Sequence, residues 1–265
     1  MIQKPIFSPQ VEWLPPTEFP DLSKYSEIAI DLETKDSDLK TMGSGSVTGR
    51  GQIVGIAVAV RDWSGYYPIA HEGGGNMDKS MVMKWFQDVL NTEATKIFHN
   101  AMYDVCFIQA AGLKISGEIV DTMIAGSLVD ENRFRYDLGS MGRDYVGRGK
   151  NEAVLAETAK EWGIDAKSEM YKLPAMYVGA YAEADAQLTL DLWQEMKKEI
   201  INQDIEDIFK LETELFPCLV DMRFLGVRVD TEAAYKLKQK LLTEEKECLR
   251  IVQKETGVDT QIWAA

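Results

Sequence analysis

A strand with two chemically different faces is the feature that most limits how this chain can fold. In the segment SEIAIDLET, the apolar side chains of Ile28, Ile30 and Leu32 recur at every second position and share one face of a strand. Asp31 and Glu33 therefore point together from the other face. Two neighbouring carboxylates repel each other unless a cation or a shared proton compensates them. The segment thus predicts a strand that carries an acidic pair in need of compensation.

A third acid, Asp104, lies in the segment IFHNAMYDVCFIQAAG. A short apolar strand around Ile97 and Phe98 leads there into a helix, which Gly112 is suited to end because glycine readily adopts the left-handed conformation that follows helices. Taken alone, Asp104 would be an ordinary acid in the first turn of a helix, where it interacts favourably with the helix dipole.

Tyr181 and Asp185 lie in the segment YAEADAQLTLDLW. Its apolar stripe continues through Leu188 and Leu192 at helical spacing, and a separation of four residues puts the phenol and the carboxylate on one helix face. Taken alone, these two residues would be an ordinary surface pair, just as an acidic pair on a strand is usually a solvated edge.

Together, the four acids favour a site for hard divalent cations. Mg²⁺ and Mn²⁺ prefer carboxylate oxygens, whereas zinc sites usually draw on His and Cys. The chain has only two His, three scattered Cys and neither a CxxC nor an HExxH motif. Two divalent ions about 3.5 to 4 Å apart can stabilise both the attacking and the leaving oxygen of a phosphodiester displacement. Metal-dependent phosphodiester hydrolysis is therefore the chemistry that uses the whole set.

The order of these groups resembles a known enzyme family. DLE, then HNAMYD, then YAEAD resemble the three motifs of the DEDD 3′-5′ exonucleases, in the subclass whose third motif carries Tyr. More narrowly, GIAVAV, YYPIAH, MVMKWFQDVL and DTMIAGSLV extend a resemblance to the proofreading domain of family A, polymerase I-like DNA polymerases over roughly residues 20–200. LETELFPCLVDMRFLGVRVDTEAAYKL resembles the helical segment with which the polymerase portion of those enzymes begins.

The resemblance implies two divalent metal ions, Mg²⁺ or Mn²⁺, and a role for each motif residue. Asp31 would be a ligand shared by both ions. Glu33 and Asp185 would complete the tighter site, and Asp104 would hold the second ion largely through water. Tyr181 would position the attacking water.

The resemblance also suggests substrate contacts. Asn100 of the second motif would contact the substrate strand, whereas the adjacent His99 is expected to be structural. Arg50 belongs to GSGSVTGRG, residues 43–51, which lacks the ending of a phosphate-binding loop and is predicted to be a mobile connection between two strands. In this family that connection lies near the active site, so Arg50 is a candidate substrate contact.

Arg143 and Arg148 lie in residues 132–150, a stretch in which basic and aromatic side chains alternate. Such a mixture can contact phosphates and stack on unpaired bases. The alternative is a solvated loop and helix end whose aromatic rings pack inward. We favour this alternative and keep the two arginines as candidate substrate contacts.

The net charge of −14 limits how a nucleic acid could be held. A polyanion is repelled by such a chain, so we expect modest affinity, with tighter binding when another basic domain presents the strand. The expected partners are a single-stranded or frayed DNA 3′ end and the remainder of a DNA polymerase. The chain has no run of 18 apolar residues and no targeting signal in MIQKPIFSPQ, which predicts no membrane partner and the cytoplasm of a bacterial or phage-infected cell. Scattered Cys agree with a reducing compartment.

The pattern of elements predicts an α/β fold of the ribonuclease H-like kind, with a mixed five-stranded sheet flanked by helices and followed by a helical C-terminal segment. The order of the strands is taken from the resemblance. An exonuclease domain is predicted over residues 1–203 and the start of a polymerase domain over 204–265. Strands are predicted at 27–33, 52–60, 64–70, 96–99 and near 118, and helices at 78–90, 102–111, 121–130, 180–200, 204 onward with a break near Pro217, and 231–255.

The leading hypothesis is a metal-dependent 3′-5′ exonuclease that hydrolyses DNA to 5′-monophosphates in proofreading. An RNA 3′-end trimming exonuclease of the ribonuclease D kind shares the motifs, although the polymerase-like tail argues against it. A catalytically silent module that binds a DNA end or a partner protein is the alternative from another class. Such a module is expected to have lost one or more acids, and all four are present here.

Overall fold

The computed structural model describes residues 10–260. Within the chain, two compact units divide between Phe224 and Leu225. The prediction that MIQKPIFSPQ carries no targeting signal concerns residues that lie mostly outside this range. The last five residues of the predicted polymerase segment also lie outside it. Across residues 10–260, no helix combines the length and apolarity needed to cross a membrane.

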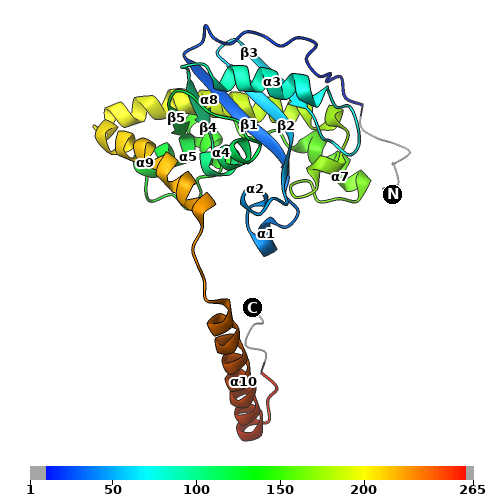
Figure 1. Ribbon diagram of the computed structural model, residues 1–265, viewed down its shortest axis with the longest axis vertical. Helices are drawn as coiled ribbons and strands as arrows, with labels where there is room; N and C mark the ends of the chain where they lie inside the picture. The colour runs from blue at the N-terminus through cyan, green and yellow to red at the C-terminus, as the bar shows by residue number, and fades with distance from the viewer. Residues whose placement is uncertain (1–9, 261–265) are drawn as a thin grey trace. The chain divides into compact units, whose positions relative to one another are not determined.

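The elements of the first unit follow the predicted order, with additional short helices between them (Figure 1). The strands are β1 (Glu27–Lys35), β2 (Gln52–Val60), β3 (Trp63–Pro68), β4 (Thr95–Phe98) and β5 (Ile119–Asp121). The helices are α1 (Leu39–Met42), α2 (Gly45–Thr48), α3 (Lys79–Leu90), α4 (Ala101–Ala110), α5 (Thr122–Val129), α6 (Leu138–Met141), the π-helix η1 (Gly142–Val146), α7 (Ala153–Trp162), the 3₁₀ turns η2 (Met170–Lys172) and η3 (Ala175–Tyr177), α8 (Gly179–Asn202) and α9 (Glu206–Leu225).

A five-stranded mixed sheet in the order β3-β2-β1-β4-β5 forms the centre of this unit. β1 pairs antiparallel with β2 and parallel with β4, so the hairpin strands and the crossover strands meet at β1. β3 extends the antiparallel side and β5 the parallel side. The predicted five-stranded sheet flanked by helices is confirmed. The predicted order of the elements along the chain is confirmed as well.

The two faces of the sheet differ in the size of their side chains. On one face, Ile28, Ile30 and Leu32 of β1 are buried with large side chains of α3 and α4, as their alternation predicted. On the other face, small side chains of the strands pack with α8, which contributes further small residues. The small residues on that face are Ala29, Ala57, Ala59, Ala182 and Ala186.

Small residues allow a helix to approach a sheet closely, because no long side chain separates the two backbones. Gly55 of β2 shows how little space is left, since a Cβ at this position would lie 2.0 Å from Oη of Tyr66. That hydroxyl is itself fixed, 2.6 Å from Nε2 of His71. The helix that carries Tyr181 and Asp185 is thereby brought onto the acidic face of β1.

The connection between β1 and β2 is more structured than its glycine-rich sequence suggested. Residues 43–51 do connect two strands, but they contain α2, a single helical turn that the sequence did not predict. The backbone N–H of Gly45 donates to both carboxylate oxygens of Asp36 at 3.1 Å. This bond pins the start of the turn next to the end of β1.

The predicted break near Pro217 is wrong, because α9 continues through this residue to Leu225. The helical spacing of apolar residues also predicts a stripe made of Ile205, Ile208, Leu211, Leu215 and Leu219. This stripe is misplaced, because Leu211 and Leu215 are exposed whereas Phe209 and Phe216 are buried. The two phenylalanines and Val220 lie on a neighbouring face of the helix and bury more area than the leucines would. α9 therefore packs with the sheet unit, and the assignment of residues 204–265 to a polymerase portion stays a prediction.

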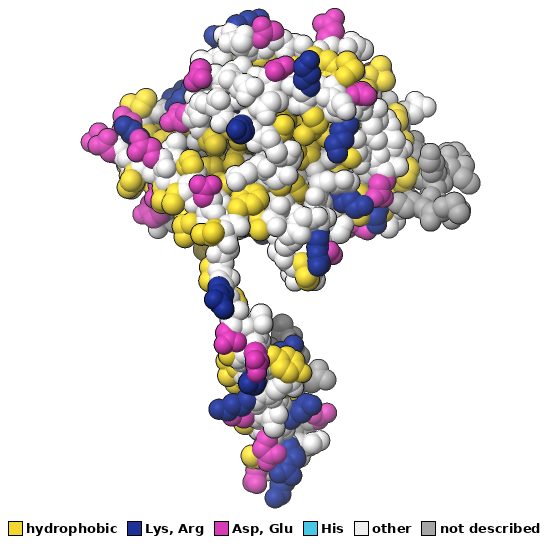
Figure 2. Space-filling model, viewed as in Figure 1, with side chains coloured by type: hydrophobic (Ala, Val, Ile, Leu, Met, Phe, Trp, Pro, Cys, Tyr) yellow, Lys and Arg dark blue, Asp and Glu magenta, His cyan; other side chains and the backbone are white. Residues whose placement is uncertain are grey.

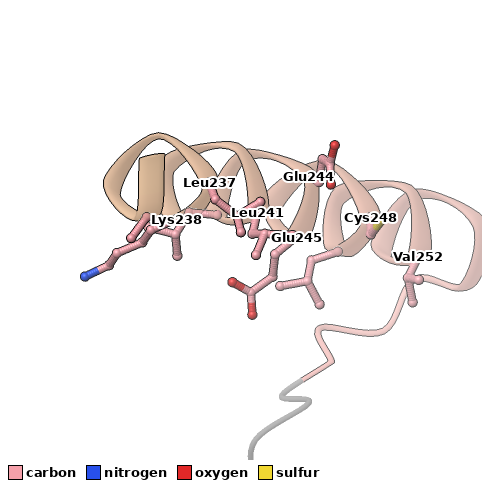
Figure 3. A pocket seen from close by; sticks show the side chains of 10 residues that line it. Leu237, Lys238, Leu241, Glu244, Glu245, Cys248 and Val252 are labelled. Carbon is pink, nitrogen blue, oxygen red and sulfur yellow. The ribbon is translucent and has the colours of Figure 1, made fainter. Parts of the chain in front are cut away.

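The second unit consists mainly of α10 (Thr231–Thr256). Asp230 caps its start by accepting a hydrogen bond from the N–H of Ala233 at 2.9 Å, and Gly257 ends it at φ +71°. None of its residues is buried, and Figure 2 shows acidic, basic and apolar side chains interspersed on its surface. Figure 3 shows Leu237 and Leu241 among the side chains along this helix. Within residues 225–260, the leucines Leu237, Leu241 and Leu242 of this helix are exposed.

Candidate active site

The acidic pair of β1 lies under α8 instead of at an open edge. Asp31 is opposite Ala57 and Glu33 is opposite Gly55 in the antiparallel pairing with β2, and the register shifts directly after Glu33. Both acids are half-buried. Their neighbours on β2 are small, which lets α8 approach this part of the strand closely.

Asp104 reaches the same place from α4. It lies in the first turn of this helix, is 5% exposed, and accepts a hydrogen bond from the N–H of Leu32 at 3.1 Å. That donor lies between the two acids of β1 in the sequence. A single backbone bond therefore fixes the third carboxylate beside the first two.

Asp121 holds the start of α4 in place, and sequence analysis did not identify it as part of the site. Its carboxylate accepts the N–H groups of Asn100 at 2.9 Å and Ala101 at 2.7 Å, while it also caps α5 through the N–H of Met123 at 2.8 Å. Asn100 has the left-handed φ of 64°, a conformation that Asn tolerates better than most residues. The acid at the start of DTMIAGSLV was the available signal, because an Asp before an apolar helix is a typical cap.

α8 supplies Tyr181 and Asp185 from one face, as their spacing predicted. Asp185 is 1% exposed, and its Oδ2 forms an ion pair with Lys150. Nζ of the same lysine donates to Oη of Tyr181 at 2.9 Å. Lys150 was noted only as part of the basic stretch 132–150, so the structure adds it to the site.

Asp31, Glu33, Asp104, Lys150 and Tyr181 border one cavity of about 860 Å³, and Asp185 is linked to it through its ion pair with Lys150. Its lining combines carboxylates, aromatic rings and cationic side chains from β1, α4, α8 and the segments between α5 and α8. The polar lining residues that matter here are Asp31, Glu33, Asn100, Asp104, Arg135, Lys150, Lys167 and Tyr181. The structure thus brings the three sequence motifs together at one cavity.

The acids raise each other's pKa values. Burial, followed by the charge of Asp185, raises the pKa of Asp31 to about 7, and the positive charge of Lys150 opposes this. Burial and then the charge of Asp31 raise the pKa of Glu33 and of Asp104 well above the ordinary values. Such a cluster binds protons or cations readily, because either relieves the repulsion.

The donor set fits hard divalent cations. It offers carboxylate oxygens, the ligand type that Mg²⁺ and Mn²⁺ prefer. Oδ1 of Asp185 is buried and lacks a hydrogen-bond partner within residues 10–260, which is costly for a carboxylate oxygen unless a cation satisfies it. In this same part of the chain, no three His, Cys, Asp or Glu side chains are yet gathered closely enough to hold a metal ion. Three of the four acids border the cavity, and Asp185 is held beside them in its ion pair with Lys150.

His99 lines the cavity but is poorly suited to act as a base. Its Nδ1 lies 2.9 Å from Oγ1 of Thr122, and its Nε2 is buried. Burial, and then the charge of Lys150, lower its pKa to about 4. A ring with such a weak affinity for protons agrees with a structural role, and this role stays a prediction.

The four predicted substrate contacts lie in different surroundings. Asn100 lines the cavity. Arg50 instead lies 3.6 Å from Asp38, Arg148 pairs with Asp191 of α8, and Arg143 is exposed on η1. None of the three arginines lines the cavity of the acids. Their contact with a substrate stays a prediction.

The stretch 132–150 matches neither sequence interpretation completely. Tyr136 and Tyr145 pack against the core, in agreement with the inward alternative, but Phe134 is fully exposed. Arg133 lies 2.6 Å from Asp144 and 5.3 Å from the centre of the Tyr145 ring. The expectation that all its aromatic rings pack inward is therefore wrong for Phe134.

A family model described as 3′-5′ exonuclease matches residues 19–201, which include all four acids and Tyr181. The chain belongs to this 3′-5′ exonuclease family. A DNA-directed DNA polymerase of Pseudomonas phage M6 is 34% identical over 97% of the chain. The chain spans only 40% of the length of that polymerase.

Two solved structures share the fold of this family member. The POL domain of Pol1 from M. smegmatis, in complex with DNA primer-template and dNTP, gives a TM-score of 0.61 at 14% identity, covering 91% of this chain and 36% of that one. Brucella melitensis NrnC with bound Mg²⁺ gives 0.55 at 16% identity, covering 78% of this chain and 89% of that one. The predicted ribonuclease H-like α/β fold is confirmed.

Proposed function

We propose that this chain is a metal-dependent 3′-5′ exonuclease that hydrolyses DNA from its 3′ end and releases 5′-monophosphates. The observation that carries the proposal is the meeting of Asp31, Glu33, Asp104 and Tyr181 at one cavity, with Asp185 joined to Tyr181 through Lys150. The similarity to a phage DNA polymerase favours DNA as the substrate and proofreading as the task.

In this proposal, the four carboxylates hold two divalent ions, Mg²⁺ or Mn²⁺. Bound there, the ions would supply positive charge to the attacking and leaving oxygens of the phosphodiester. After burial, the charge of Asp31 has the largest effect on the pKa of both Glu33 and Asp104, which indicates that Asp31 lies close to both of them. This central position agrees with a ligand shared by both ions.

Tyr181 would position the attacking water through its hydroxyl group. Burial, followed by the charge of Glu33, raises its pKa above the ordinary value, so the phenol keeps its proton. A protonated phenol can donate one hydrogen bond and accept another, which orients a water without removing its proton. Asn100, which lines the same cavity, is the proposed contact to the substrate strand.

The partners of the site follow from its charge. A chain with a net charge of −14 holds a polyanion weakly, so a single-stranded or frayed 3′ end is best delivered by a second, more basic protein surface. The remainder of a DNA polymerase is the proposed source of that surface. The phage relative favours action in the cytoplasm of an infected bacterial cell.

The test is stepwise shortening of labelled strands. 5′-labelled single-stranded DNA and RNA of matching sequence are incubated with the chain in Mg²⁺, in Mn²⁺ and in EDTA, beside an Asp31→Ala variant. We expect metal-dependent shortening of DNA, with a loss of about 10³-fold or more in the variant, since metal-held charge contributes several kcal/mol to the transition state.

Two other outcomes would favour the alternative functions. Faster shortening of RNA than of DNA would favour trimming of RNA 3′ ends of the ribonuclease D kind. Binding of the strands without shortening in either metal would contradict an exonuclease and favour a silent module that binds a DNA end or a partner.

A further inference from the structure

Lys150 is the basic side chain most closely tied to the acids of the cavity. Its ammonium group pairs with Oδ2 of Asp185, donates to Oη of Tyr181 at 2.9 Å, and lies 5.1 Å from the centre of the Tyr181 ring. Its side chain is only 26% exposed. Among residues 10–260, it is the only Lys or Arg that forms an ion pair with any of the four acids.

The position of this ammonium group bears directly on the carboxylate that lacks a partner. Lys150 forms an ion pair with Oδ2 of Asp185, while Oδ1 of the same carboxylate is buried and has no hydrogen-bond partner within residues 10–260. One ammonium charge is too little for a cluster of four acids. The site is therefore only partly compensated by the chain's own residues.

The segment that carries Lys150 is able to move its side chain. Lys150 lies between the end of η1 and the start of α7, outside any helix or strand. Gly147 has φ +81°, and Gly149 lies one residue before the lysine. A long, flexible side chain on an irregular segment can withdraw without unfolding its neighbours.

We propose that Lys150 is an internal counter-cation, which holds Asp185 and Tyr181 in place while no divalent ion is bound and releases Asp185 when such ions bind. This inference rests on the metal site of the proposed function. It agrees with the arrangement of the acids, since three of them border the cavity while the fourth, Asp185, is paired with the ammonium group of Lys150. Lys150 is accordingly a positioning residue that acts through Tyr181 and Asp185.

The experiment compares binding of Mn²⁺ alone, by isothermal titration calorimetry, to the wild-type chain and to Lys150→Met. The matched control is Lys167→Met, because Lys167 lines the same cavity but is exposed and makes no ion pair with an acid within the described residues. Removing a competing charge at contact distance should tighten Mn²⁺ binding about tenfold in Lys150→Met, whereas Lys167→Met should stay within about twofold of wild type. Lys150→Arg, which keeps the charge, should restore most of the wild-type affinity.

Thermal melting separates this role from a purely structural one. In EDTA at pH 8, Lys150→Met should melt below the wild type, because the acids then lack the one ion pair that they form within residues 10–260. Saturating Mn²⁺ should remove the difference. A chain that simply loses its packing would melt lower in both conditions.

The decisive quantity is the Mn²⁺ affinity. Equal or weaker binding by Lys150→Met overturns the proposal whatever the melting temperature, because it would mean that Lys150 supports the metal site and does not compete with it. Shortening of labelled DNA by the wild type is measured in parallel, so that failure of the nuclease activity is recognised separately. A wild-type chain that binds no Mn²⁺ overturns both proposals.

Discussion

The two faces of the central sheet perform different tasks. One face joins β1 to α3, α4 and α9 through large apolar side chains, such as Ile30 and Phe86, which are almost completely buried. The other face joins the same strand to α8 through small residues, such as Ala57 and Ala186, and carries Asp31 and Glu33. Each face has its own hydrophobic core, and the comparison shows that the face of β1 with small neighbours is the one that carries the acidic pair.

The difference follows from what each face has to hold. Large side chains bury more area and stabilise the fold, but they would fill the space that four carboxylates and a substrate need. Small residues contribute less to stability and let α8 bring Tyr181 and Asp185 within reach of β1. Substitutions that change the size of side chains should therefore act differently on the two faces.

The largest expected effect on stability comes from the large-residue face. Phe86→Ala removes a fully buried ring from α3 and should lower the free energy of unfolding by about 3–5 kcal/mol, while the metal affinity of the folded protein is unchanged. The control is Met81→Ala at an exposed position of the same helix, which should change stability little. Chemical denaturation measures the first quantity and Mn²⁺ titration the second. A strong loss of metal affinity in folded Phe86→Ala would break the division of tasks.

On the small-residue face, enlarging a side chain should damage the site more than the fold. Ala186→Leu inserts bulk between α8 and the sheet, and overpacking of this kind costs about 1–3 kcal/mol. It should also shift Asp185 and weaken both metal binding and hydrolysis. Ala180→Leu, at an exposed position of the same helix, serves as the control. Unchanged hydrolysis by Ala186→Leu would show that the close approach of α8 is not needed.

Much of the fold was predictable because local patterns and tertiary packing agree. The alternation of Ile28, Ile30 and Leu32 identified β1 and its buried face, and the structure confirms both. α9 was predicted less well, because two apolar stripes compete on its surface. The choice between Leu211 and Phe209 depends on the shape of the surface that receives the helix, which local periodicity does not contain.

The site was predictable where a residue belongs to a motif and not where it acts through a neighbour. The four acids and Tyr181 carry spacing and order, so their meeting could be foreseen. Lys150 lies in the irregular segment between η1 and α7, and only the tertiary fold of this segment brings it to the site. The same holds for Asp121, whose two cap bonds join helices that are separate in the sequence.

The acidic face should also make stability depend on pH when no metal is bound. The pKa of Asp31 is raised from 3.8 to about 7, chiefly by burial. The folded protein therefore holds a proton that the unfolded chain loses near pH 4, so this contribution to stability falls as the pH rises from about 4 to 7 and stays lost above it. Because Asp31 is only half-buried, we expect an effect of about 1 kcal/mol.

Melting in EDTA between pH 5 and pH 8.5 measures this effect. Asp31→Asn cannot ionise at this position, so the variant should be the more stable protein at pH 8 and should show a flatter pH profile. Identical profiles for the two proteins would mean that the acids of β1 are compensated in some other way. Saturating Mn²⁺ should flatten the wild-type profile above pH 7, because the cation replaces the proton.

The smallest expected effect concerns one hydroxyl on the small-residue face. Tyr181→Phe removes a hydrogen-bonding group without changing the packing of α8, so hydrolysis should slow by about three- to tenfold, the value of one hydrogen bond in the transition state. Mn²⁺ affinity should stay unchanged, because the hydroxyl is assigned to water and not to a metal ion. Tyr235→Phe on exposed α10 provides the matched control. Tyr181 also accepts a hydrogen bond from Lys150. A marked loss of metal affinity in Tyr181→Phe would contradict the assigned role and place the phenol in the metal site.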